Sequence, residues 1–358
     1  MAHRKLLAVS VCVTLLSALL GAQSDPETLI KQKHFKRARV LLERRLAANP
    51  KDVSALVTLA GVEAEFKNND AAIKLASEAI SLQPGNAQAH AILAQSYGQK
   101  TDENIGMFAK LRLARSFKKE VEQALSIDPR NLDALWGMMI FDLEAPGMVG
   151  GDKSRAPEFA DRIMAVDVDR GYLAKQELAK REKKSDQFAA LVIKAAEANS
   201  HSYEALARLA GFYSSGKSKN LAQAASLAMK AVQLDKGRAE AYDVLARIYA
   251  EQEQWHDLDQ LLQTAEKAVP DDSTPYYQAG RVLLGTGKDN SRAERYFRKY
   301  LIQDPEPGMP ALAHAHWRLG LVLEKQGNKP QAIKELETAL HLMPGLKPAE
   351  NDLKRIKS

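Results

Sequence analysis

A proline recurs along this chain after successive alanine-spaced segments, and its spacing constrains the fold more than any other feature. The prolines that carry the spacing best are Pro50, Pro84, Pro270, Pro305 and Pro344. The interval from Pro50 to Pro84 is nearly the same as that from Pro270 to Pro305, and Pro344 follows at a slightly longer interval. A period of about 34 residues is typical of solenoids built from helix–turn–helix units. Stacked units of this kind form extended binding surfaces, so the spacing predicts a protein that holds other molecules.

The residues within each period predict two packed helices. In the cleanest unit, residues 239–270, apolar side chains recur at intervals of three and four, which is the spacing of one helix face. Small residues such as Ala246 and Ala265 fall where two helices must approach within about 8–10 Å. The proline ends the second helix because it cannot continue the hydrogen-bond ladder. Units of the same pattern end at Pro84 and Pro344.

These residues resemble the tetratricopeptide repeat. The small residues at the family's helix-contact positions are Ala60, Ala72, Ala79, Ala246, Ala265, Gly320, Ala332 and Ala339. The resemblance implies an all-α, right-handed solenoid of about eight stacked helix–turn–helix units, with a concave groove lined by the first helices. The sequence departs from the family at the first-helix tryptophan, and it lacks the lysine and asparagine of the family's clamp for a C-terminal carboxylate.

The repeat pattern divides the chain into five parts. They are a signal peptide (1–24), N-terminal units with an extended helix and a Gly-rich loop (25–168), a degenerate repeat (169–200), C-terminal units (201–344) and a short capping helix (345–358). The extended helix carries the basic run 110–119, and the loop is Glu144–Lys153. In this region the chain also resembles exported bacterial tetratricopeptide-repeat proteins.

The N-terminal segment 1–24 predicts export. A short positive stretch precedes the apolar run 6–20, and small residues follow it, which is the pattern of a secretory signal peptide. The run is short for a spanning helix, which needs about 20 apolar residues. We expect cleavage after Ala22 or Ser24 and a periplasmic or secreted product. That product has no cysteine, because Cys12 is the only one in the chain. Peripheral association with the membrane stays open.

The charge balance favours a protein partner over a nucleic acid. The formal net charge is +6 at pH 7, and removal of Arg4 and Lys5 with the signal leaves about +4. A nucleic-acid-binding domain of this length is expected to carry a strong basic stripe. We therefore predict no nucleic-acid partner.

One string matches a phosphate-binding loop, Gly211–Ser218 (GFYSSGKS). Such a loop works only between a buried strand and a helix. Here the preceding residues 203–210 have helical spacing, and the string falls at the turn of a repeat. We therefore expect no nucleotide cofactor from it.

Other candidate motifs have simpler interpretations. Glycine-rich turns such as Gly147–Lys153 can bind anions through N–H groups, but a loop with capping by Asp152 or Ser154 explains it as well. His314 and His316 are two positions apart on a helix, so they point to different sides and cannot easily share a metal. No catalytic motif is present, and we predict no catalytic residue, cofactor or metal.

Three functions remain open. The first is a non-enzymatic exported scaffold that binds a protein or peptide segment in its groove, as helix-lined grooves do. The second is a cell-envelope component that binds a small solute or lipid there. The third is a nucleotide-binding enzyme through Gly211–Ser218.

The repeat register also predicts the binding residues. Counting from the helix contacts places Asp243 and Arg247 on the groove in one unit, Tyr277 and Arg281 in the next, and Trp317 in the last. The two arginines are one repeat period apart, so their guanidinium groups share one position in successive units and can grip carboxylates bidentately. The aromatic residues are typical binding anchors. The alternative is an ion pair between Arg247 and Asp243, one turn away on the same helix.

Overall fold

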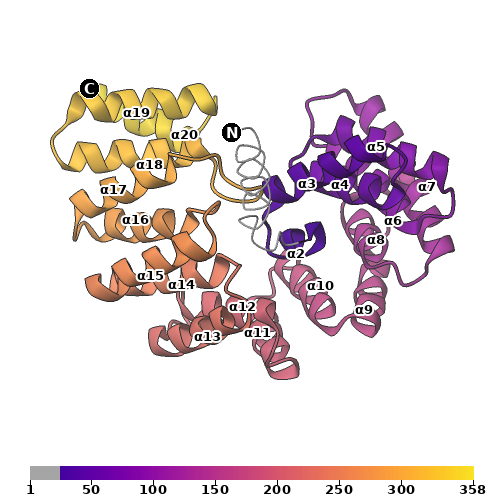
Figure 1. The fold of residues 1–358 in the computed structure, drawn as a ribbon, viewed down its shortest axis with the longest axis horizontal. Helices are drawn as coiled ribbons and strands as arrows, with labels where there is room; N and C mark the ends of the chain where they lie inside the picture. The colour runs from indigo at the N-terminus through magenta and orange to yellow at the C-terminus, as the bar shows by residue number, and fades with distance from the viewer. Residues whose placement is uncertain (1–24) are drawn as a thin grey trace, which may run out of the picture.

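The chain is an all-α solenoid in the computed structural model, which describes residues 25–358 (Figure 1). The predicted signal peptide and its cleavage sites lie outside the described residues. The described helices are α2 (Pro26–Lys31), α3 (Phe35–Ala48), α4 (Val53–Glu65), α5 (Asn69–Leu82), α6 (Ala87–Lys100), α7 (Met107–Ile127), α8 (Leu132–Glu144), α9 (Ala156–Val166), α10 (Val168–Arg181), α11 (Ser185–Ala198), α12 (Tyr203–Tyr213), α13 (Leu221–Leu234), α14 (Glu240–Glu251), α15 (Trp255–Ala268), α16 (Thr274–Thr286), α17 (Asn290–Tyr300), α18 (Leu312–Lys325), α19 (Lys329–Leu342) and α20 (Lys347–Lys357).

Helices α2 to α19 pair in chain order as nine hairpins, and α20 packs on the last of them. The sequence predicts about eight units, so the described part of the chain holds one more. No proline follows α9, α11 or α13, so the spacing that marks the other units lapses there. Residues 169–200, where the repeat pattern is degenerate, nevertheless form most of the regular hairpin α10–α11.

The recurring prolines end second helices, as their spacing predicts. Five of them stand two positions after the last helical residue: Pro50, Pro84, Pro129, Pro270 and Pro344. The alanines five positions earlier are fully or almost fully buried: Ala79, Ala124, Ala265 and Ala339. Alanine at these points lets the two helices of a hairpin approach closely, and the small helix–helix contacts form the core of each unit.

The turn inside most hairpins uses one residue in the left-handed conformation. Glycine takes this position in later units, at Gly287 (φ 70°) and Gly327 (φ 81°). Other units place Lys67 and Glu253 there, both with φ 58°. A left-handed residue after a helix closes its last turn and redirects the chain. The turn geometry is therefore kept even where the sequence does not supply glycine.

The longest described helix is α7, with 21 residues. It contains the basic run 110–119, and it packs on α6 and α8. Across residues 25–358, no helix is both long and apolar enough to cross a membrane.

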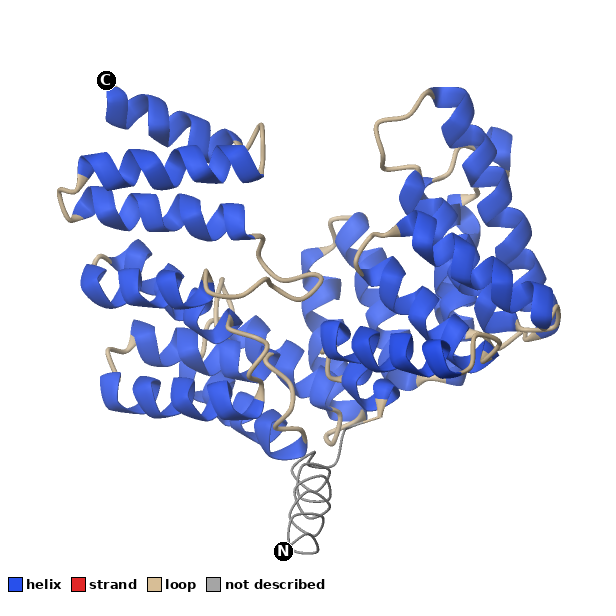
Figure 2. Cartoon of the chain, turned by 45° about the horizontal axis from the view of Figure 1, so that its top comes forward, coloured by secondary structure: helices blue, strands red, loops and turns tan. Residues whose placement is uncertain are grey.

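The solenoid curls until its first hairpin touches its C-terminal half (Figures 1 and 2). The Gln32 side chain donates to Asp235, 2.9 Å away, and the His34 ring contacts the Gly237 carbonyl (2.8 Å) and Asp271 (3.0 Å). We call the interactions of Gln32, Lys33, His34 and Lys36 with the C-terminal half the closure contact. No repeat pattern predicts it, because its partners are separated by several repeats of the chain.

The loop between α17 and α18 completes the closure contact. Its Glu306 is 3% exposed and accepts a hydrogen bond from the Lys36 backbone N–H (3.2 Å). Burial raises the pKa of Glu306 to about 7. Figure 2 shows this loop reaching from the C-terminal helices toward the centre of the molecule. The curl is therefore held by contacts from both halves of the chain.

Candidate functional site

A cavity of about 1760 Å³ occupies the concave side of the curl. Its wall is built by the first helices α4, α6, α8, α10, α12, α14 and α16, together with α7. The first hairpin adds Glu27, Ile30 and Lys33, because the closure contact brings that hairpin to the cavity. The first helices line the concave surface because their partners pack on the outside. The closure contact turns an open groove into a surrounded site.

The N-terminal wall of the cavity combines apolar and charged side chains. Its apolar members include Ile92, Trp136 and Phe141. Its carboxyl groups include Glu65 and Asp133. Burial raises the pKa of Glu65, and the negative charge of Asp133 acts in the same direction. Asp133 is itself paired with Arg170 at 2.9 Å. Lys33 and Lys110 also lie on this side of the cavity, so the wall suits an apolar ligand surface and carries charges of both signs.

The C-terminal wall carries arginines from successive first helices. Arg208, Arg247 and Arg281 come from α12, α14 and α16 and all line the cavity. Arg247 donates to the Ser214 hydroxyl (2.8 Å), and Arg281 donates to the Gln278 amide oxygen (3.0 Å). Among the described residues, none of the three arginines forms an ion pair with a carboxylate. This wall therefore offers cationic groups that form no ion pair within residues 25–358, next to the carboxylates of Glu204, Glu240 and Asp243.

Three of the predicted binding residues lie on the cavity: Asp243, Arg247 and Arg281. The predicted alternative, an ion pair between the first two, is absent, because Arg247 turns to Ser214 instead. Burial raises the pKa of Asp243 well above its usual range, and the charges of Asp272 and Glu240 act in the same direction. One oxygen of Asp243 is buried without a hydrogen-bond partner. Asp243 is thus a weak counterion for the arginine beside it.

The two predicted aromatic residues are not on the cavity wall. Tyr277 is 3% exposed and packs edge-on against Phe297, with ring centroids 5.8 Å apart. Trp317 is half-buried and donates from its indole N–H to Asp352 of the capping helix at 2.8 Å. The prediction that these two side chains face the groove is wrong, because the large rings fill the contact between neighbouring helices. Both rings instead support the guanidinium of Arg318, at 5.3 Å and 4.7 Å.

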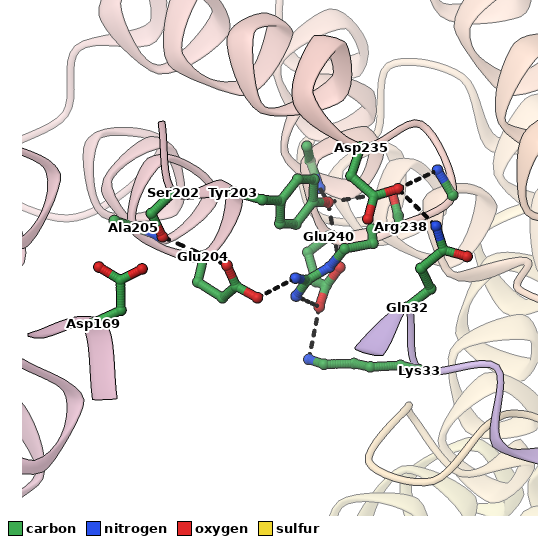
Figure 3. Close-up of polar contacts among 12 residues, drawn as sticks. Gln32, Lys33, Asp169, Ser202, Tyr203, Glu204, Ala205, Asp235, Arg238 and Glu240 are labelled. Carbon is green, nitrogen blue, oxygen red and sulfur yellow. Dashed lines mark hydrogen bonds and ion pairs between the residues drawn. The ribbon is translucent and has the colours of Figure 1, made fainter. Parts of the chain in front are cut away.

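A partly buried charge cluster on the cavity wall, shown in Figure 3, has no counterpart among the predicted site residues. Arg238 is 4% exposed and lies between Glu204 and Glu240, the latter 3.1 Å away. Its guanidinium carbon also lies 4.1 Å from the centre of the Tyr203 ring. Lys33 reaches Glu240 from the first hairpin at 2.7 Å. Burial opposes ionisation of Glu240, but the charges of Lys33 and Arg238 lower its pKa to about 2. The cluster joins the two halves of the chain electrostatically.

The remaining motifs have structural roles. Gly211 lies inside α12, and Gly216 takes a left-handed turn (φ 72°) before α13, with no strand within residues 25–358. In the Gly147–Lys153 loop, the buried Asp142 accepts hydrogen bonds from the Asp152 N–H and the Arg155 guanidinium. The N–H groups of residues 150–152 are thereby used internally. No three metal-ligating side chains converge in the described part of the chain.

Comparisons with known proteins agree with the fold. Residues 29–96 and residues 277–347 each match a family described as tetratricopeptide repeat. Both ranges lie within the continuous run of nine helical hairpins formed by α2 to α19. The chain is a tetratricopeptide-repeat protein.

Solved structures of the same class are similar in fold. A tetratricopeptide-repeat protein of Thermus thermophilus aligns with a TM-score of 0.46 and 18% identity, over 52% of this chain and 94% of that one. Yeast Tom70 aligns with a TM-score of 0.49 and 12% identity, over 95% of this chain and 88% of Tom70. Human IFIT1, solved as a dimer with m7Gppp-AAAA, aligns with a TM-score of 0.43 and 15% identity, over 89% of this chain and 80% of IFIT1. A search of curated proteins found no significant match. At this level of similarity the neighbours bear on neither ligand nor partner.

Proposed function

We propose that this chain is a non-enzymatic interaction scaffold that holds a segment of a partner protein in its central cavity. The cavity carries the proposal: seven first helices and the closure contact surround one continuous space of about 1760 Å³. Sites for small molecules usually measure about 300–1,000 Å³. The larger space favours a polypeptide segment over the alternative of a small solute or lipid.

The helical walls also suit a segment. Stacked repeats present side chains from one helix after another, so that a ligand chain can contact several units at once. The apolar N-terminal wall and the cationic C-terminal wall lie on the same cavity, which gives a ligand chain both packing and polar contacts.

We also propose that the protein is exported and works in the periplasm or outside the cell. The pattern of residues 1–24 supports this proposal. N-terminal sequencing of the mature protein tests it, with a first residue at position 23 or 25 as the expected result. Retention of Met1 contradicts it.

A photocrosslinking amino acid placed on the cavity wall tests the scaffold. Thr58 lies on the cavity and is half-buried, whereas Lys334 is exposed on the outer helix α19. We expect the probe at Thr58 to label one discrete polypeptide segment, which mass spectrometry maps, and the probe at Lys334 to leave it unlabelled. A synthetic peptide of the mapped sequence should compete. Equal labelling from both positions, or labelling of lipid alone at Thr58, contradicts the proposal.

A further inference from the structure

Four successive units each place one arginine on the first helix. These residues, which we call the arginine row, are Arg208 on α12, Arg247 on α14, Arg281 on α16 and Arg318 on α18. Arg247 and Arg281 are one repeat period apart and occupy the same position of the repeat. Arg208 and Arg318 stand three positions earlier in their own units, which is the same helix face one turn away. The row therefore follows one face of the C-terminal half, and its first three members line the cavity, whereas Arg318 lies beyond it.

The arginine row has no ion-pair partner among the described residues. No salt bridge joins any of its members to a carboxylate within residues 25–358, whereas some other arginines are paired, as Arg155 is with Asp142 and Arg238 with Glu204 and Glu240. Arg247 and Arg318 are half-buried, and burial lowers the pKa of both, whereas Arg208 and Arg281 are exposed. A sheltered charge without a partner is unfavourable, and an incoming anion relieves that cost.

Members of the row are close enough to repel one another. In addition to burial, the positive charge of Arg281 lowers the pKa of Arg247 on one side and of Arg318 on the other. Stacking on Tyr277 and Trp317 holds the Arg318 guanidinium in place. Such fixed guanidinium groups suit carboxylates, which they bind through two parallel hydrogen bonds.

The opposite wall decides what kind of anion fits. Glu65 and Asp102 line the N-terminal side of the same cavity without an ion-pair partner in the described residues, whereas the carboxylates of Asp133 and Glu144 are paired with arginines. A nucleic acid carries a negative charge at every nucleotide and would meet these carboxylates as well as the arginines. A ligand with charge at one end only avoids that repulsion. Its uncharged end can pack on apolar side chains such as Trp136.

We propose that the cavity binds a segment with two parts, an acidic part held by the arginine row and an apolar part packed on the N-terminal wall. The proposal rests on the scaffold function above and names its ligand chemistry. The partner is a protein whose bound stretch is rich in Asp or Glu next to apolar residues.

A designed peptide tests the proposal directly. The probe is a fluorescein-labelled peptide with an apolar half followed by a glutamate-rich half, and its binding to the full chain is followed by fluorescence anisotropy. The comparison probes are a lysine-rich version, a version with the acidic residues scattered, and a single-stranded RNA of matched length. We expect the two-part acidic peptide to bind at least tenfold more tightly than any of the others. Equal or tighter binding of the RNA overturns the proposal.

Matched variants locate the binding. Arg247→Ala combined with Arg281→Ala should weaken peptide binding at least tenfold. The control combines Arg44→Ala with Arg295→Ala, which removes the same charge from two exposed arginines that form no ion pair in the described residues. The control should keep the wild-type affinity, and equal weakening by both pairs overturns the proposal. Circular dichroism and thermal melting establish that each variant is folded.

A charge-conserving variant separates geometry from charge. Arg247→Lys combined with Arg281→Lys keeps the charge but loses the two-pronged hydrogen bonds. We expect an affinity between those of the wild type and the alanine variant, and no loss with lysine contradicts bidentate binding. Failure of this proposal can be told apart from failure of the scaffold proposal. If the probe at Thr58 labels a segment without acidic residues, the scaffold stands and the arginine row is not its binding feature.

Discussion

At the residue scale, single small side chains set how closely the helices pack. Ala265 is 2% exposed and packs with Tyr242 and Val269 inside the unit that ends at Pro270. Gly320 is equally constrained, since an added Cβ would lie 3.0 Å from the Leu336 side chain and 3.1 Å from the Ala332 carbonyl oxygen. Interiors packed at crystal-like density cannot absorb extra methyl groups without shifts of the backbone.

Enlarging one of these residues should therefore destabilise the protein. We predict that Ala265→Leu lowers the free energy of unfolding by about 1–3 kcal/mol, because overpacking forces strained rotamers or helix displacement. Thermal denaturation followed by circular dichroism measures the change. Ala47→Leu, on an exposed position of α3, is the matched control and should have little effect. An unchanged melting curve for Ala265→Leu contradicts the assigned register of the repeat.

At the element scale, each hairpin depends mainly on its neighbours. Helices α9 and α10 come together at Gly171, where an added Cβ would lie 2.3 Å from the Met164 Cα. That atom belongs to the backbone, so no side-chain rotation can make room. Only glycine allows the approach, and the two helices must separate if another residue stands there.

The expected effect of separating them is local. We predict that Gly171→Ala speeds amide hydrogen exchange in α9 and α10 and in the adjoining α8 and α11, but not in α18 and α19. In a solenoid the stabilising contacts run between nearest neighbours, so a local defect spreads only a short way. Hydrogen-exchange mass spectrometry measures the change. A uniform increase over all helices would show that the solenoid unfolds as one unit and would refute the prediction.

At the scale of the whole molecule, the closure contact depends on groups that titrate near neutral pH. Burial opposes the positive charge of His34. The hydrogen bond to Asp271, the negative charge of Asp271 and the hydrogen bond to the Gly237 carbonyl outweigh burial and raise the pKa of His34 above 6.5. The contribution of His34 to the stability of the closure contact is therefore full below pH 6.5 and is lost as the pH rises through the raised pKa. Arg37, which lies 4.0 Å from Asp271, lowers the pKa of His34 slightly.

The other carboxyl groups of the contact set the rest of the pH window. Burial raises the pKa of Glu306 from 4.5 to about 7 despite the charge of Lys36, so its contribution to the stability of the contact is full below pH 4.5 and is lost as the pH rises through 7. Burial also opposes the charge of Asp271, but the bond to His34 lowers its pKa below 3.8, so its contribution is lost only in strong acid. The closure contact should therefore be most stable near pH 4 and should weaken as the pH rises, first through the titration of Glu306 and then through that of His34.

A distance measurement across the opening tests this window. We predict that spin labels at Ser81→Cys and Lys334→Cys, in a Cys12→Ser background, report a longer or broader distance at pH 8 than at pH 5.5. Ser81 on α5 and Lys334 on α19 are exposed and lie in opposite halves of the curl (Figure 1). The control for an open state combines Gln32→Ala with His34→Ala, which removes the contacts with Asp235, Gly237 and Asp271. Identical distances at both pH values contradict the prediction.

The sequence by itself determined the class of fold. The prolines and the buried alanines follow from local rules, since a helix end needs only its own residues and a helix contact needs small side chains at fixed spacing. For the same reason the register correctly put Asp243, Arg247 and Arg281 on the concave side. Their binding role stays a prediction.

The tertiary structure alone decided what the repeat leaves free. The closure contact joins Gln32 to Asp235 and His34 to Asp271, and small changes in the angle between successive units, summed over nine hairpins, decide whether such distant residues meet. No local pattern encodes that sum. The curl also made the groove a cavity with apolar side chains on its N-terminal wall and a row of arginines on its C-terminal wall. Tyr277 and Trp317 moved into packing contacts because large rings lower the free energy more when they fill the space between helices than when they face water.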